Sequence, residues 1–125
     1  MQTFILIGLF FCHFLGDFTF LSTTSMLSAK QTGKQVLPVL AHAGVHGLLM
    51  LIFLFCFIPI DTLLILKLIG FQVVTHFLID ISKGRMNGWF PILIDPANKW
   101  FWLLFGFDQF LHALVIIGMS YYAVA

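Results

Sequence analysis

The sequence predicts an all-α, polytopic membrane protein with a single membrane domain, residues 1–125, folded as a bundle of four transmembrane helices. The chain is 61% hydrophobic and only 9% charged, which leaves too few charges to coat a soluble domain of this size. Its apolar residues also fall into four runs, each close to the roughly 20 residues that cross a bilayer core. We therefore predict helices at about 3–21, 36–58, 62–82 and 100–123.

Polar or very short links separate these predicted helices. The first link is STTSMLSAKQTGKQ, residues 22–35, and the second is IPID, residues 58–61, which is short enough to force a tight hairpin. The third link, SKGRMNGWFPILIDPANK, contains Gly, Pro and Asn and has tryptophans in it and just after it. We predict an ordered interfacial loop there, with Trp89, Trp100 and Trp102 at headgroup depth.

The basic residues are unevenly distributed. Lys67 alone lies near the second link, and the other five lie in or beside the first and third links: Lys30, Lys34, Lys83, Arg85 and Lys99. The positive-inside rule then predicts a multi-pass protein of the inner (cytoplasmic) membrane, with both termini outside. A net charge of +1 provides no basic face, so no nucleic-acid partner is expected. Membrane lipid is the expected partner, and a homodimer is left open.

Every histidine stands four residues from another histidine or from an aspartate, and each predicted helix carries one such pair. This spacing places both side chains of a pair on one helix face. Because consecutive helices run antiparallel, all four pairs should gather toward the lysine-rich end of the bundle. The pairs are His13/Asp17, His42/His46, His76/Asp80 and Asp108/His112. Within this end, the paired residues should form two layers along the bundle axis. The layer deeper in the membrane is expected to contain His13, His46, His76 and His112.

Metal binding is the chemistry that best suits this pattern. Ionisable residues inside a membrane are costly and usually mark function. Imidazoles and carboxylates together suit transition metals, and paired ligands on facing helices are how bundles build dinuclear sites. We therefore predict that all eight residues hold divalent transition metal, as two ions of zinc, iron or manganese. A proton relay made of the same residues is the main alternative.

The predicted activity is hydrolysis of a lipid-linked phosphate ester, because two ions about 4 Å apart can clamp both oxygens of a displacement. The carboxylates lie nearer the links, so Asp17, Asp80 and Asp108 are the predicted catalytic residues, as bridging ligands or general bases. By default, the basic residues set the orientation of the protein in the membrane and contact anionic lipid. The more specific hypothesis is that Lys30, Lys83 and Arg85 form a cradle for a substrate phosphate. Whether the protein is an enzyme stays open. It would otherwise be a metal-ion or proton transporter, an ion-handling subunit, or a non-catalytic subunit with a structural metal.

A short internal repeat accompanies the pairs. The motif HFLGD at 13–17 returns as HFLID at 76–80. We predict a pseudo-repeat of residues 1–60 and 61–125, in which two helical hairpins are related by a pseudo-twofold axis along the membrane normal.

The order HxLGDF, a histidine-rich second helix, HFLID and DQxLH resembles a family of small bacterial integral membrane proteins of unknown function. It is more loosely similar to small membrane proteins classed as metal-dependent hydrolases. The resemblance spans nearly the whole chain and adds Gln109 to the expected substrate contacts. This sequence has Leu21 where the resemblance implies a glutamine. The motif residues that the resemblance implies are His13, Gly16, Asp17, His42, His76, Asp80, Asp108, Gln109 and His112.

Overall fold

The computed structural model describes residues 1–125 and contains five α-helices and one short 3-10 helix, with no strand. The fold is all-α, as predicted. The helices are α1 (Gln2–Phe18), α2 (Thr24–Thr32), α3 (Val36–Phe57), α4 (Thr62–Trp89), η1 (Pro91–Ile94) and α5 (Lys99–Tyr122).

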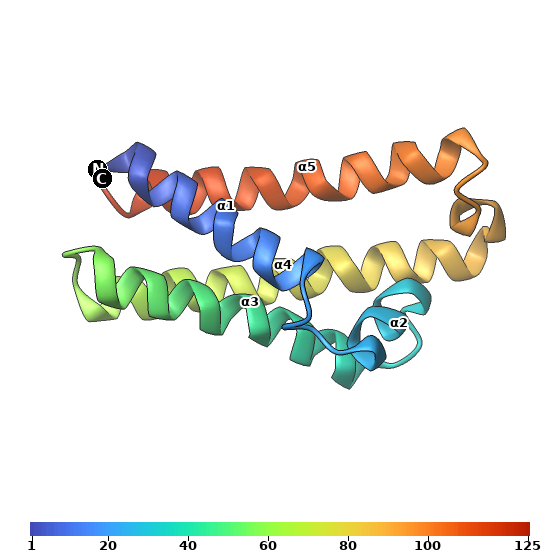
Figure 1. Ribbon diagram of the computed structural model, residues 1–125, viewed down its shortest axis with the longest axis horizontal. Helices are drawn as coiled ribbons and strands as arrows, with labels where there is room; N and C mark the ends of the chain where they lie inside the picture. The colour runs from blue at the N-terminus through green and yellow to red at the C-terminus, as the bar shows by residue number, and fades with distance from the viewer.

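The four longer helices pack in a ring. α1 contacts α3, α3 contacts α4, α4 contacts α5, and α5 returns to α1. Both chain termini lie at one end of the molecule, whereas α2 and η1 lie toward the opposite end (Figure 1). α2 packs against α3 and α4, and η1 packs against α4 and α5, so these two short helices flank the bundle where the basic residues gather.

The prediction of four spans is wrong, because three helices, α3, α4 and α5, are long and apolar enough to cross a membrane. α1 has 17 residues, which makes it about 25 Å long against a hydrocarbon core of about 30 Å. It ends because the hydroxyls of Thr19 and Ser22 donate to the carbonyls of Leu15 and Gly16. The chain then leaves the helix in an extended conformation at Thr19.

The first link, predicted as a connection only, contains the helix α2. The Thr23 hydroxyl caps its first turn by accepting a hydrogen bond from the Met26 amide at 3.2 Å. Gly33 closes its last turn in the left-handed conformation, with φ of 63°, and its amide donates to the Ala29 carbonyl. The position of α2 matters for the site, since Lys30 lies on it.

α4 is longer than predicted. The sequence placed its end near residue 82, but the helix continues through the SKGRMNG segment to Trp89. Asp80 therefore lies nine residues before the end of α4, and Asp108 lies nine residues after the start of α5. At 1.5 Å per residue these carboxylates are about 14 Å from those helix ends. The His76/Asp80 pair thus lies deeper along α4 than the predicted helix end at residue 82 implied, whereas the start of α5 is within one residue of the prediction.

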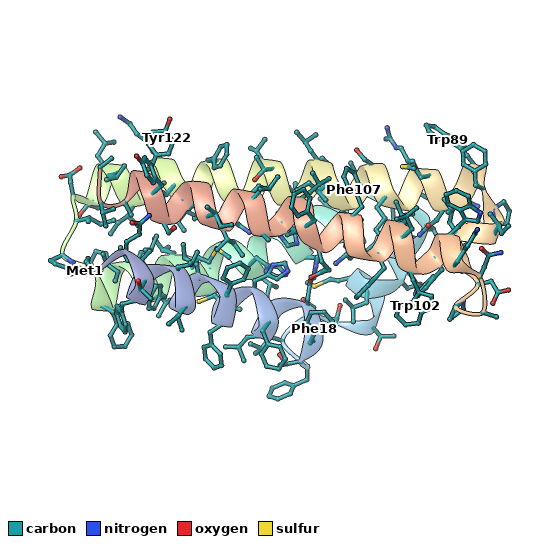
Figure 2. All side chains as sticks on the ribbon, turned by 90° about the horizontal axis from the view of Figure 1, so that it is seen from above. Met1, Phe18, Trp89, Trp102, Phe107 and Tyr122 are labelled. Carbon is teal, nitrogen blue, oxygen red and sulfur yellow. The ribbon has the colours of Figure 1, made fainter.

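The interior has two regions along the bundle axis. The half near the termini has an apolar core that includes Leu9, Met50 and Met119, all fully buried. The half toward α2 is polar and contains the paired histidines and aspartates. Large apolar side chains lie on the outside of the long helices, as with Phe55 at 66% and Phe107 at 54% exposed. Figure 2 shows such side chains projecting outward along the whole bundle. This pattern is consistent with a lipid-facing surface.

The predicted pseudo-repeat stays a prediction. Its two first helices, α1 and α4, have 17 and 28 residues, so the halves differ in helix length.

Candidate metal centre

The four histidines predicted for the deeper layer form a ring inside the bundle, one from each long helix. Ring centroids lie 5.0 Å apart for His13 and His46, 4.0 Å for His46 and His76, 4.3 Å for His76 and His112, and 5.1 Å for His112 and His13. All four are buried. The i, i+4 spacing therefore does place imidazole side chains from four separate helices next to one another.

Two overlapping groups of side chains have ligand atoms close enough to share an ion. The first group is Asp17, His42, His46 and His76, and the second is His76, Asp80 and His112. In each group these atoms lie within 4.8 Å of one another. His76 belongs to both groups. Three imidazoles and one carboxylate are a donor set typical of zinc and of other first-row transition metals.

His42 is held in one tautomer by a serine that the sequence analysis did not single out. The Ser22 hydroxyl donates to the Gly16 carbonyl at 2.8 Å and lies 2.8 Å from His42 Nδ1. Since its one hydrogen is used on the carbonyl, the hydroxyl accepts from Nδ1–H of His42. In the neutral imidazole Nε2 of His42 then carries a lone pair, and it faces Asp17 Oδ1 at 3.0 Å.

His112 is fixed in the same tautomer. Its Nδ1 lies 2.8 Å from the backbone carbonyl of Asp108, which can only accept, so Nδ1 carries the hydrogen. Nε2 of His112 is left with a lone pair, is buried and makes no hydrogen bond. Asp80 Oδ1 lies 3.5 Å from this nitrogen. A lone pair facing a carboxylate oxygen is repulsive unless a cation lies between them.

Several other polar atoms of the cluster are buried without a hydrogen bond. Both oxygens of Asp80 are in this state, as is Nε2 of His76, although Oδ2 and Nε2 lie 3.1 Å apart. One oxygen each of Asp17 and Asp108 is also unpaired. Buried polar groups are nearly always paired in folded proteins, and unpaired ones are costly. These atoms fit a coordinated cation, which would take up their lone pairs together.

Two lysines supply positive charge at the carboxylates. Lys30 Nζ lies 3.1 Å from Asp17 and 3.5 Å from Asp80, and Lys83 Nζ lies 3.2 Å from Asp108. Burial alone would lower the pKa of Lys30, but the carboxylates of Asp80, Asp17 and Asp108 raise it above its ordinary value. Lys30 therefore stays charged at the edge of the cluster.

Two glycines allow close approaches that position these groups. A Cβ added at Gly16 would lie 2.5 Å from the imidazole of His46, so only glycine lets α1 pack directly against that ring. A Cβ at Gly84 would lie 2.5 Å from the backbone of Gly33, at the end of α2. Gly84 therefore lets α2 dock against α4 and bring Lys30 to the cluster.

The structure places the remaining predicted residues in different ways. His13 and Asp108 lie beside the two ligand groups but in neither. His13 Nε2 lies 3.3 Å from both Asp17 Oδ2 and Gln109 Oε1, and Asp108 pairs with Lys83. Gln109 also donates to Asp108 at 3.1 Å. Arg85 is exposed and makes no hydrogen bond or ion pair with the cluster, so it is not brought to the site.

Sequence reasoning missed Ser22 and Gln72. Gln72 lies one turn before His76 and its amide is 3.4 Å from His76 Nδ1, so the i, i+4 series in α4 extends to three residues. That spacing was a signal that could have found Gln72. No spacing signal marks Ser22, which lies in a link.

A family model described as "Protein of unknown function (DUF3307)" matches residues 5–125. This match agrees with the predicted resemblance to a family of unknown function, and no similarity to metal-dependent hydrolases is found. No curated protein matches the chain, and no solved structure matches it.

Proposed function

The chain belongs to the DUF3307 family, whose function is unknown, and we propose that it is an integral membrane metalloprotein with a His/Asp centre that binds one or two divalent transition-metal ions. The observation that carries this proposal is the fixed orientation of His42 and His112. Both hold Nδ1 in a hydrogen bond and turn Nε2 toward a buried carboxylate, an orientation in which the neutral imidazoles can act as metal ligands. The hydrogen bonds on the opposite ring nitrogens are those expected of metal-binding histidines.

The residues that would hold metal are the six of the two ligand groups: Asp17, His42, His46, His76, Asp80 and His112. A divalent ion bound there would polarise a substrate oxygen and make coordinated water more acidic. Zinc, iron and manganese all accept such donors, with zinc and iron favoured by the imidazoles.

We further propose hydrolysis of a lipid-linked phosphate ester as the activity. Asp80 and Asp108 each keep a buried oxygen free of hydrogen bonds, so each can accept a proton or bind an ion. Lys30 and Lys83 lie beside these carboxylates and would neutralise an anionic substrate. Asp17, Asp80 and Asp108 are the proposed catalytic groups, and Gln109 is positioned to orient Asp108.

A transport function fits the molecule less well. A transported ion needs polar groups along its whole path, but an apolar core that includes Leu9, Met50, Leu54 and Ile116 fills the half of the bundle near the termini. The polar cluster therefore opens toward one end only.

The proposed location is the cytoplasmic membrane, with both termini outside. The termini share one end of the bundle, and α2, the end of α4 and the start of α5, which carry four basic residues, lie toward the other (Figure 1). Cytoplasmic segments are enriched in lysine and arginine.

Metal analysis tests the metal centre. The protein, purified in a neutral detergent, is expected to retain at least one transition-metal ion per chain. Changing His112 to Ala removes a ligand and should lower that content, whereas changing Lys67 to Gln, far from the cluster, should not. Unchanged metal content in a His76→Ala, His112→Ala double variant would show that the centre is not a metal site.

A second experiment separates a catalyst from a structural metal site. Asp→Asn changes at positions 17, 80 and 108 keep the side-chain volume but remove the negative charge. We expect at least one of these variants to stay folded and partly metallated while losing function in cells. The measurement compares cellular function with retained metal across the three Asn variants and Ala variants of His13, His46, His76 and His112. If function follows metal content in all seven variants, the catalytic assignment is wrong.

A further inference from the structure

A cavity of about 280 Å³ lies between α2, α4, η1 and α5, next to the two lysines that contact the carboxylates of the cluster. Lys30 and Lys83 line it, and their Nζ atoms contact Asp17, Asp80 and Asp108. Both lysine side chains are largely buried, at 13% and 18% exposed. Most of the remaining wall is apolar. The cavity thus combines two buried positive charges with an otherwise hydrophobic lining.

A second cavity lies next to the first, toward the outside of the bundle. It has a volume of about 360 Å³, is lined only by apolar residues, and shares Leu93 and Leu104 with the first cavity. Its other walls include Trp100, Leu103 and Phe107, which are 47%, 61% and 54% exposed on the outer surface. Trp102 and Phe107 mark this stretch of α5 in Figure 2. This second cavity is therefore an apolar groove on the outer surface of the bundle. It faces lipid if α4 and α5 span the membrane.

The charge of the site favours an anion once metal is bound. Three carboxylates against two ammonium groups leave one net negative charge when the histidines are neutral. One divalent ion reverses this to one net positive charge. The two lysines that line the cavity then lie in a cluster with one excess positive charge. Buried charge of one sign needs a partner of the other sign, and a phosphate group would provide it.

We infer that the two adjacent cavities together bind a membrane lipid with an anionic phosphate headgroup, the phosphate at Lys30 and Lys83 and the chain in the second cavity, between α4 and α5. This inference rests on the proposed function, because it names the substrate class of the same metal centre. The combined size of the cavities suits it, since ligand sites commonly measure about 300–1,000 Å³. The apolar groove selects a phosphate that carries a hydrocarbon chain over free phosphate.

The test uses metal-loaded protein purified in dodecyl maltoside, titrated with dodecyl phosphate or with inorganic phosphate and followed by thermal shift. The neutral detergent itself supplies the control for a chain without a phosphate. We expect saturable stabilisation by dodecyl phosphate and little by inorganic phosphate. Lys83→Gln should weaken the effect at least about tenfold, because a hydrogen bond between charged groups is lost. Lys67→Gln, which removes an equal charge near the other end of α4, should leave it unchanged.

Leu104→Trp tests the groove without touching a charge. It should weaken dodecyl phosphate binding by filling space in the two cavities, both of which Leu104 lines, while metal content stays the same. Metal content is measured on every sample, so the two proposals are read separately. If the purified wild type contained no bound transition metal, the proposed function would be overturned. Full metal content without saturable dodecyl phosphate binding, or equal binding of inorganic phosphate, would overturn the lipid inference alone.

Discussion

Gly16→Ala should disable the metal centre without altering any proposed ligand. The added Cβ would lie 2.5 Å from Cε1 and 2.6 Å from Nε2 of His46, whereas ordinary contacts begin at 3.4 Å. The imidazole must therefore retreat by about 1 Å, or α1 must move away from α3. His46 has little room to retreat, because it is fully buried and its ring lies 4.0 Å from that of His76.

This displacement is large on the scale of metal coordination. Ligand distances in a working site hold to within about 0.2 Å, so a shift of about 1 Å removes His46 from the first ligand group. We expect metal affinity to fall by about 10- to 100-fold or more, which is the range seen when groups that orient ligands are lost. Overpacking should also destabilise the bundle by about 1–3 kcal/mol.

Gly44→Ala is the matched control, since Gly44 lies two residues before His46 and a Cβ there would meet nothing within 4 Å. The assay measures zinc affinity by competition with a chelator, together with the thermal midpoint of each detergent-solubilised variant. Gly44→Ala should match the wild type in both. If Gly16→Ala also keeps wild-type zinc affinity, His46 is not a ligand and the packing argument at α1 is wrong.

Three further outcomes follow from the same geometry. His76→Ala should reduce metal content per chain more than His13→Ala, because His76 belongs to both ligand groups and His13 to neither; equal losses would contradict the grouping. Gly84→Ala should lower the thermal midpoint, because its Cβ would lie 2.5 Å from the backbone of Gly33, while Gly88→Ala, with its nearest neighbour at 3.9 Å, should not. Removal of metal by a chelator should lower the thermal midpoint of the wild type, since buried carboxylates lose their counterion, and re-addition of zinc should restore it.

The i, i+4 spacing was sufficient to predict that four histidines from four helices lie together inside the bundle. It works because residues four apart share a helix face and because helix order places the pairs at similar depths. The ring of His13, His46, His76 and His112 follows from those two rules alone. Neither rule gives the rotation of each helix in detail, which is why His13 and Asp108 lie beside the ligand groups rather than within them.

The length and ends of the helices were harder to predict from hydropathy. The apolar run at 3–21 continues through Phe18 and Phe20, but the helix stops at Phe18 because hydroxyls in the following turn bind its last carbonyls. Similarly, SKGRMNG resembles a loop in composition, yet it extends α4 to Trp89 because Gly84 packs on the end of α2. Both outcomes depend on contacts between segments, which composition does not report.

The number of ions follows from the charge that the site can hold. Asp17, Asp80 and Asp108 face Lys30 and Lys83, so a single divalent ion brings the buried cluster from one negative to one positive charge. A second ion would leave three uncompensated positive charges in a region of low dielectric, which is very costly. We therefore expect about one ion per chain in the wild type. Replacing Lys30 with Met removes one positive charge, so a single divalent ion would leave the cluster neutral; metal content should stay near one ion per chain, and zinc affinity should rise. Two ions in the wild type, or no gain in zinc affinity in Lys30→Met, would mean that the charge of the lysines does not set the stoichiometry.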